Sequence, residues 1–226
     1  MSNNKIVVYG ITRSGTTLLW ESIRLGFDAP RRDEAFMLSA DDRRYIDKEI
    51  DNYNFEASGE DPVVLNLHTN NLQDFSPNQL KRWVSVLEDR NFHVVEIKRE
   101  DFRDLVISNY ISGHTGEFSE HSLKTFVATK EGMMVWMKRI SILQDKMDEN
   151  TLNIPVHQKI TMEQFIKDGG ITIGEQDFKI DDIPIATLDH LKSPKKSDRI
   201  ENWDEALKMY DELYEEFGHK MSYHKW

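Results

Sequence analysis

Short apolar runs alternate along this chain with segments in which apolar residues recur every three or four positions. Four of these runs have the length and β-rich composition of buried parallel strands, and they span residues 5–9, 62–67, 92–97 and 154–160. The segments with helical spacing span residues 16–26, 77–89, 105–110, 121–147, 161–169 and 203–217. This alternation predicts an α/β fold with three layers, in which helices flank a central, mainly parallel sheet.

Capping residues mark several of the predicted helix boundaries. Ser76, Pro77 and Gln79 form a capping-box pattern with proline at the first helical position. Thr161 and Gln164 repeat the capping-box spacing before a short helix. Residues 170–194 show no clear period, and we expect them to be irregular.

Composition narrows the function classes. A chain of 226 residues can bury one sizeable core, so we expect a single domain over residues 1–226. The net charge of -11 argues against a nucleic-acid partner, and the lack of cysteine excludes disulfides and thiol chemistry. The first apolar run is too short for a signal peptide or a membrane helix, so we expect a cytoplasmic protein with no membrane partner.

The loop at residues 10–17 has the glycine spacing of a Walker A loop, with Gly10 and Gly15 at its two glycine positions. Backbone N–H groups at such a helix start form a cradle for anions. Thr16 stands where a nucleoside-triphosphate loop carries its lysine, so a main charge clamp for ATP is missing. Arg13 and the loop hydroxyls suit a terminal phosphate or phosphosulfate that binds without an obligatory metal. The plainer alternative is a tight strand-to-helix turn that binds nothing.

Residues 12–19, Thr-Arg-Ser-Gly-Thr-Thr-Leu-Leu, resemble the 5′-phosphosulfate-binding loop of sulfotransferases. Members of that family use 3′-phosphoadenosine 5′-phosphosulfate (PAPS) as donor and release 3′-phosphoadenosine 5′-phosphate (PAP). The motif style is closest to that of bacterial carbohydrate and tyrosylprotein sulfotransferases. The resemblance implies one sulfotransferase-like domain over the chain, with the donor bound by Arg13, Ser14, Gly15, Thr16, Thr17 and Leu18.

The family's second element is a strand that ends in arginine, followed by a helix that carries a serine, and together they hold the donor's 3′-phosphate. Arg99 ends such a strand here, and Ser108 lies in the following helix pattern. The gap between them is one residue longer than in cytosolic aryl sulfotransferases and resembles that of bacterial carbohydrate sulfotransferases, which implies that Lys98 or Arg103 could share the phosphate. Residues 192–202 are similar to the closing segment of several bacterial members, which implies that Lys196 or Lys195 completes the nucleotide site. Ordinary surface charge is the alternative for these residues.

Sulfuryl transfer to an alcohol needs in-line geometry, stabilisation of the leaving oxygen and a base for the acceptor's proton. Arg13 and the loop amides are candidates for the stabilising groups. Glu34 resembles the glutamate in a loop of tyrosylprotein and bacterial trehalose sulfotransferases. His68 closes the second predicted strand and resembles the base of cytosolic sulfotransferases. Either residue is a candidate base, and both can face one acceptor pocket, one as base and one as orienter.

Two other functions stay open from the sequence. A P-loop small-molecule kinase shares the strand, loop and helix start, but it needs a lysine clamp and a carboxylate for magnesium. A catalytically silent nucleotide-binding protein could keep the fold alone. The acceptor cannot be predicted, because the pocket falls in variable loops, and a peptide, a carbohydrate and a small alcohol are all open.

Overall fold

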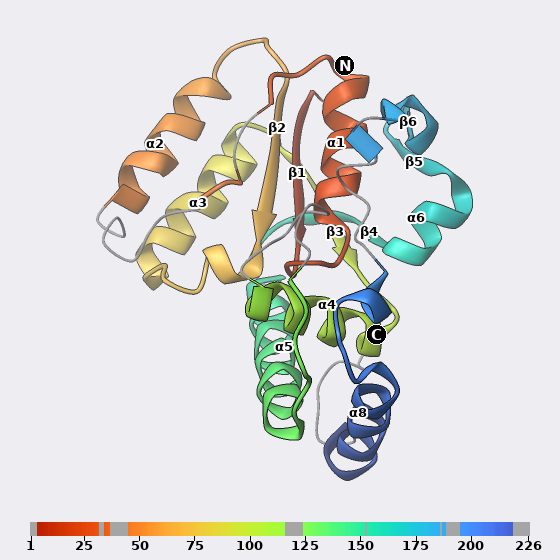
Figure 1. Ribbon diagram of the computed structural model, residues 1–226. Coiled ribbons are helices and arrows are strands. Elements are labelled where there is room, and N and C mark those ends of the chain that lie inside the picture. The colour runs from red at the N-terminus through yellow and green to blue at the C-terminus, as the bar shows by residue number, and fades with distance from the viewer. Residues whose placement is uncertain are drawn as a thin grey trace. The chain divides into compact units, whose positions relative to one another are not determined.

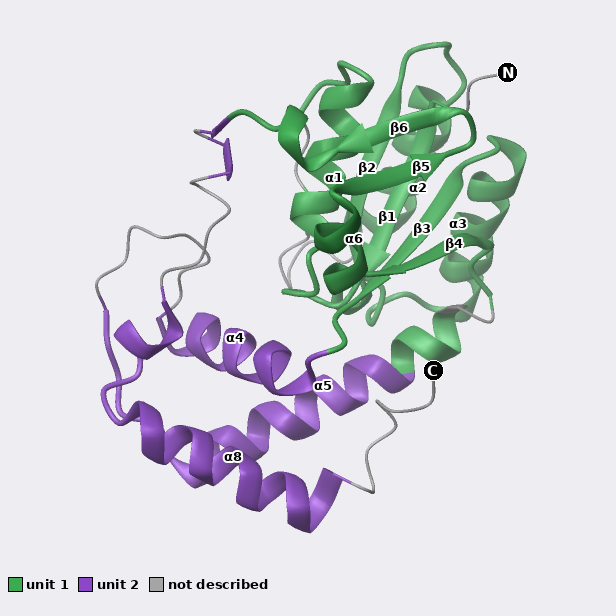
Figure 2. Ribbon diagram, turned by 90° about the vertical axis from the view of Figure 1, so that its right-hand side faces the viewer, with its two compact units in different colours: residues 1–100, 146–184 green, residues 101–145, 185–226 purple. Residues whose placement is uncertain are grey.

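A computed structural model describes residues 4–31, 34–36, 45–115, 124–151, 153–185, 187–188 and 195–218 (Figure 1). The chain divides into two compact units (Figure 2). The first unit comprises residues 1–100 and 146–184, and the second comprises residues 101–145 and 185–226. The expectation of one domain over the whole chain stays a prediction. Every helix in the described part of the chain is too short or too polar to cross a membrane.

The first unit is built on a four-stranded parallel sheet. Its strands are β1 (Lys5–Gly10), β2 (Val63–His68), β3 (His93–Lys98) and β4 (Val156–Thr161), in the order β2-β1-β3-β4. All three neighbouring pairs run parallel. The predicted α/β fold with a parallel sheet is therefore confirmed, with strand boundaries within two residues of those expected.

Helices pack against both faces of this sheet, because buried strands alternate apolar side chains between the two faces. On one face lie α1 (Thr16–Gly26) and α6 (Met162–Asp168), and α3 (Pro77–Asp89) lies on the other (Figures 1 and 2). The α1 face has a continuous apolar core, to which Ile6, Val8, Leu19, Ile23, Ile97 and Phe165 contribute. Burial of these side chains is the main stabilising contribution to the unit.

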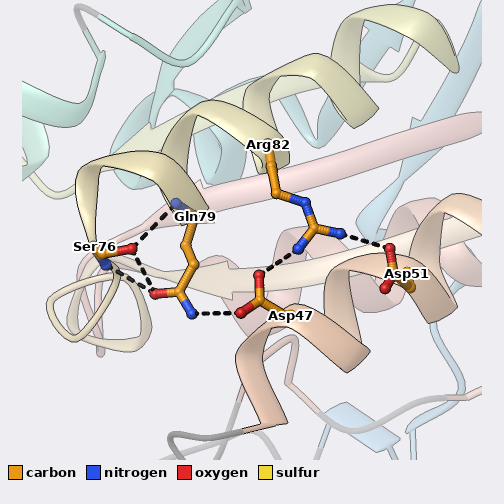
Figure 3. Close-up of polar contacts among 5 residues, drawn as sticks. All are labelled: Asp47, Asp51, Ser76, Gln79 and Arg82. Atoms are coloured by element: carbon orange, nitrogen blue, oxygen red, sulfur yellow. Dashed lines mark hydrogen bonds and ion pairs between the residues drawn. The ribbon is translucent and has the colours of Figure 1, made fainter.

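The helix α2 (Ile46–Glu56) falls outside the segments for which the sequence patterns predicted a helix. Its buried side chains, Ile46 and Ile50, stand one turn apart, while most of its other residues are exposed. An exposed helix with a narrow apolar stripe gives a weak periodic signal, which explains why it was missed. Arg82 of α3 reaches across to α2, with its Nη2 2.7 Å from Asp51 Oδ1 and its Nη1 on Asp47 (Figure 3).

Residues 170–179 form a hairpin where the sequence suggested irregular chain. Strand β5 (Gly170–Ile173) pairs antiparallel with β6 (Gln176–Lys179). Gly174, with φ +63°, supplies the turn. The hairpin buries Ile171, Ile173 and Phe178 in the α1 core, so packing stabilises two strands of only four residues each. The short helices η2 (Thr69–Asn71) and η3 (Ile180–Asp182) complete the unit's described elements.

The second unit contains α4 (Phe102–Thr115), most of α5 (Lys130–Thr151), η4 (Lys196–Asp198) and α8 (Trp203–Phe217). The predicted helix at residues 203–217 is confirmed, and it buries Ala206, Tyr210 and Leu213. The helix predicted at residues 121–147 begins later, at Lys130, and residues 121–123 lie outside the described part. Before α5, Phe126 forms a bridge with Ile200, so a contact distant in sequence takes the place of the expected helical turn.

Candidate functional site

The first unit brings three chain segments together at one edge of the sheet. Gly10 at the end of β1 pairs in register with His68 of β2 and with Ile97 of β3. The loop after β1, the end of β2 and Arg99 after β3 therefore leave the sheet at the same edge. In the sheet order, β2 lies on one side of β1 and β3 lies on the other, so the chain changes sides after β2. Open parallel sheets commonly bind ligands at the crevice that such a change of side creates.

The loop after β1 is held in a tight, partly strained conformation. A Cβ atom at Gly10 would lie 2.6 Å from the carbonyl oxygen of Ile97, so glycine is needed there. Ser14 donates its backbone N–H to Ile11 O at 3.0 Å and its hydroxyl to Ile97 O at 3.3 Å. Arg13 has φ +70°, a left-handed conformation that is uncommon for a residue with a side chain. The first of these hydrogen bonds closes a turn within the loop, and the second fixes the loop to β3.

Helix α1 begins at Thr16, directly after Gly15. Gly15 has φ +99°, and a Cβ atom there would collide with the sulfur of Met162 from α6. The position therefore requires glycine for two reasons, and it has no side chain with which to cap the helix. The first turn, residues 16–19, contains no acidic residue. The N–H groups of this turn are suited to an anion, because the helix dipole places partial positive charge there.

Two arginines lie beside this helix start. Arg99 donates from Nη1 to the backbone oxygen of Arg13 at 3.2 Å, which joins the loop after β3 to the loop after β1. Burial lowers the pKa of the Arg13 guanidinium, and the positive charge of Arg99 lowers it further. The predicted donor residues Arg13 and Arg99 are thus brought together, and their mutual repulsion favours an anion at this point.

Thr16, His68 and Glu34 form a hydrogen-bonded chain. The Thr16 hydroxyl oxygen lies 2.6 Å from His68 Nε2, and His68 Nδ1 lies 2.9 Å from Glu34 Oε2. Thr16 and His68 are 1% and 2% exposed to solvent, whereas the side chain of Glu34 is 34% exposed. The two candidate bases are therefore joined in one chain that starts at the loop, and Glu34 is its accessible end.

Contacts of the two residues that follow Glu34 anchor the backbone next to it. Ala35 donates its N–H to Asn66 O at 2.8 Å, and the Asn71 side chain donates to Ala35 O at 2.8 Å. Phe36 follows with φ +59°, and its ring meets those of three other aromatic residues edge-on, which are Tyr53, Phe75 and Trp83. Such T-shaped contacts are favourable. Asn71 and Phe36 were not among the predicted site residues, although paired asparagines after a strand are a known turn signal.

Opposing influences set the charge of Glu34. Partial burial raises the pKa of its carboxyl, but the hydrogen bond and charge of His68 and a hydrogen bond from Asn71 lower it by more. The net pKa lies below the ordinary value of 4.5, so Glu34 is ionised at neutral pH. An ionised, partly exposed carboxylate can accept a proton from a neighbouring hydroxyl group.

The remaining predicted donor residues are divided between the two units. Thr17 and Leu18 lie in the first turn of α1 and are half-buried, with Leu18 packed against the apolar core. Ser108 is buried in α4 of the second unit, where its backbone oxygen accepts the hydroxyl of Ser112 at 3.0 Å. Lys196, also in the second unit, forms an ion pair with Asp104. A role for Ser108 and Lys196 in donor binding stays a prediction.

Other basic residues near the predicted motifs form ion pairs within their own units. Lys98 Nζ lies 2.9 Å from Asp148 Oδ1, on the sheet face opposite Ile97. Arg31 Nε lies 3.5 Å from the buried carboxylate of Glu21. Of the two neighbouring basic residues Lys98 and Arg99, it is therefore Arg99 that contacts the loop after β1. Among the described residues, histidine and acidic side chains do not gather in the threes that a metal ion needs.

A scan of protein-family models found no match to this chain, and a search of curated proteins found none either.

Proposed function

We propose that this protein is a sulfotransferase that moves a sulfuryl group from PAPS to a hydroxyl acceptor and releases PAP. The single observation that carries the proposal is the contact of Arg99 with the backbone of Arg13 beside the start of α1, where no side chain caps the helix. Two neighbouring guanidinium groups and the N–H groups of a helix start together favour a ligand with several negative charges.

The residue types of the loop favour phosphosulfate over a nucleoside triphosphate. Thr16 occupies the lysine position of a Walker A loop, and its hydroxyl is bonded to His68. Arginine presents a planar fork of donors that matches the oxygens of a phosphate or sulfuryl group. In this proposal Arg13 and the loop amides bind the 5′-phosphosulfate, and Arg99 binds the 3′-phosphate.

The transfer step is a substitution at sulfur. The acceptor oxygen forms a bond to sulfur while the bond from sulfur to the bridging oxygen of the 5′-phosphate breaks. PAP leaves with the electron pair of that bond, and Arg13 and the loop N–H groups stabilise its developing charge. The proton of the acceptor hydroxyl moves to the base.

We assign the role of base to Glu34 and a positioning role to His68. Both ring nitrogens of His68 have hydrogen-bond partners, and its side chain is almost fully buried. Glu34 is ionised and more exposed, so it can approach an acceptor hydroxyl. The anchors at Ala35 and Phe36 keep its backbone close to the end of β2.

Calorimetric titration with PAP, beside ATP with magnesium, tests the donor site. We expect the wild type to prefer PAP, and Arg99→Ala to weaken PAP binding by about tenfold to a hundredfold, because a hydrogen bond to a charged group contributes about 1.5–3 kcal/mol. The matched control is Arg82→Ala, which removes an arginine that pairs with Asp47 and Asp51 on the surface. The control should bind PAP as the wild type does.

The outcomes separate the three candidate functions. A preference for ATP would favour the kinase. Binding of PAP without transfer from labelled PAPS to any carbohydrate, peptide or small alcohol in a broad panel would favour a silent nucleotide-binding protein. Failure to bind either nucleotide would overturn the proposal.

Glu34→Gln tests the assignment of the base once an acceptor is found. Glutamine keeps the shape of the side chain but does not take the proton, so we expect turnover to fall by a factor of about 10²–10⁴. PAP affinity should stay within about twofold of the wild type, which shows that the donor site is intact. Turnover that survives in Glu34→Gln but is lost in His68→Gln would reassign the base to His68.

A further inference from the structure

The Thr16 hydroxyl has a single proton to donate and two possible recipients. One is His68 Nε2, which lies 2.6 Å from the hydroxyl oxygen. The other is an anion at the start of α1, since Thr16 is the first residue of that helix. Because a hydroxyl has one donor and two acceptor sites, it cannot donate to both at once.

The state of Glu34 decides which way this proton points when the loop holds no anion. An ionised carboxylate only accepts hydrogen bonds, so His68 must carry its proton on Nδ1, facing Glu34. A neutral imidazole then has an unprotonated Nε2, which accepts from Thr16. With the ring in this neutral form, the hydroxyl proton of Thr16 is directed at His68 Nε2 and not at the anion position.

An anion that takes the Thr16 proton reverses this arrangement. His68 Nε2 must then donate to the Thr16 oxygen, which requires a proton on Nε2. The contact between His68 and Glu34 also needs a proton, so the pair holds two protons in place of one. The additional proton leaves a solvent or buffer molecule and forms an N–H bond on the pair, and no bond between heavier atoms is made or broken.

We propose that His68 is a positioning residue that couples anion binding on the loop to protonation of the Glu34–His68 pair, which takes up a proton as the anion binds. This inference rests on the proposed function, in which the anion is the 5′-phosphosulfate end of the donor. The doubly protonated ring donates to Thr16 and to Glu34 together, and it thereby holds the carboxylate ionised and in place while the donor is bound.

The surroundings of His68 are consistent with this coupling. Among the described residues, Glu34 is the charged group in contact with its ring, and the neighbouring side chains of η2, Thr69 to Asn71, are neutral. On β1, Gly10 lies beside His68, and burial raises the pKa of the Tyr9 phenol, which keeps it neutral. Arg13 and Arg99 follow strands that end at the same edge of the sheet, and an anion bound there adds negative charge that favours a second proton on the pair.

Calorimetry of PAP binding near neutral pH, in buffers with different ionisation enthalpies, counts the protons that are taken up. We expect up to about one proton per site for the wild type and for Thr16→Ser, which keeps the hydroxyl. Thr16→Val removes the hydroxyl, and His68→Gln can bridge its neighbours but cannot take a proton. Both should lose the uptake, and Thr16→Val should also bind PAP about tenfold more weakly. The titration of PAP itself cancels in the difference between variants.

Equal proton uptake in all four proteins, with PAP bound, would overturn this inference and leave the sulfotransferase proposal standing. Failure of the wild type to bind PAP would overturn both. If Thr16→Val does not fold, nitrogen NMR of the His68 ring gives a second measurement, with its signal assigned by its loss in His68→Gln. We expect both ring nitrogens to carry protons at saturating PAP, and a ring that keeps a single proton there would also overturn the inference.

Discussion

The helices α1 and α3 both follow a strand of the sheet, but their first turns are completed in different ways. At α3, Ser76 accepts from the backbone N–H of Gln79 at 3.3 Å, and Gln79 Oε1 accepts from the N–H of Ser76 at 2.9 Å (Figure 3). At α1, the capping position is Gly15, which has no side chain. The capping box of α3 supplies hydrogen-bond partners from the helix's own first residues. The first N–H groups of α1 have no such side-chain cap, so their partners must come from elsewhere.

This difference separates a structural helix start from one suited to a ligand. The side chains at the start of α3 make further contacts at the protein surface, such as the hydrogen bond that Gln79 Nε2 donates to Asp47 Oδ2 at 3.1 Å. The hydroxyl at the start of α1 leads through His68 to the ionised Glu34. A capping box stabilises a helix alone, whereas an uncapped start beside two arginines can also bind an anion.

Gly15→Ala should give the largest effect, because it fills the helix start that the proposal assigns to the donor. The left-handed backbone costs about 1–2 kcal/mol for a residue with a Cβ atom, and that atom must also displace Met162. We expect a lower melting temperature and PAP binding weakened by more than about tenfold. The control is Gly174→Ala, at φ +63° with open space around it, which should lose stability but keep PAP affinity. Similar PAP affinities for the two variants would contradict the assignment.

Ser76→Ala should have a smaller effect, confined to stability. Removal of a side-chain cap costs about 1 kcal/mol, which urea unfolding can measure. PAP affinity should not change, since the capping box of α3 only completes its own helix. A loss of PAP binding in Ser76→Ala would show that the two helix starts are not independent, and would weaken the comparison.

The smallest effect concerns the pH dependence of stability. The pKa of Glu34 is lower in the folded protein than its ordinary value of 4.5, so the unfolded chain binds more protons between these two values. Glu34 therefore contributes stability that is fully present above pH 4.5 and is lost as the pH falls through its folded pKa. Urea unfolding from neutral to acidic pH should show that the difference between wild type and Glu34→Gln shrinks in this window. The cost of Ser76→Ala should stay constant there, because its partners do not titrate.

Local sequence features predicted much of the first unit. The strands were recognisable because each is a short apolar run, and the capping box at Ser76 and Gln79 marked the start of α3 to the residue. The exposed helix α2 and the hairpin of β5 and β6 were missed, because their apolar residues are few and become significant only when they pack. The beginning of α5 was misplaced, since the contact of Phe126 with Ile200 replaces its expected first turns.

The sequence by itself determined the glycine loop, the unusual residue at the lysine position and the candidates Arg13, Glu34, His68 and Arg99. Spacing and residue type are enough for these, because backbone conformation and hydrogen-bonding capacity are local properties. Only the tertiary structure decided that Arg99 contacts the backbone of Arg13. It also decided that Glu34 is hydrogen-bonded to His68, and His68 to Thr16, so that the two candidate bases do not stand apart. Such contacts depend on the register of parallel strands, which brings together residues that lie tens of positions apart in the chain.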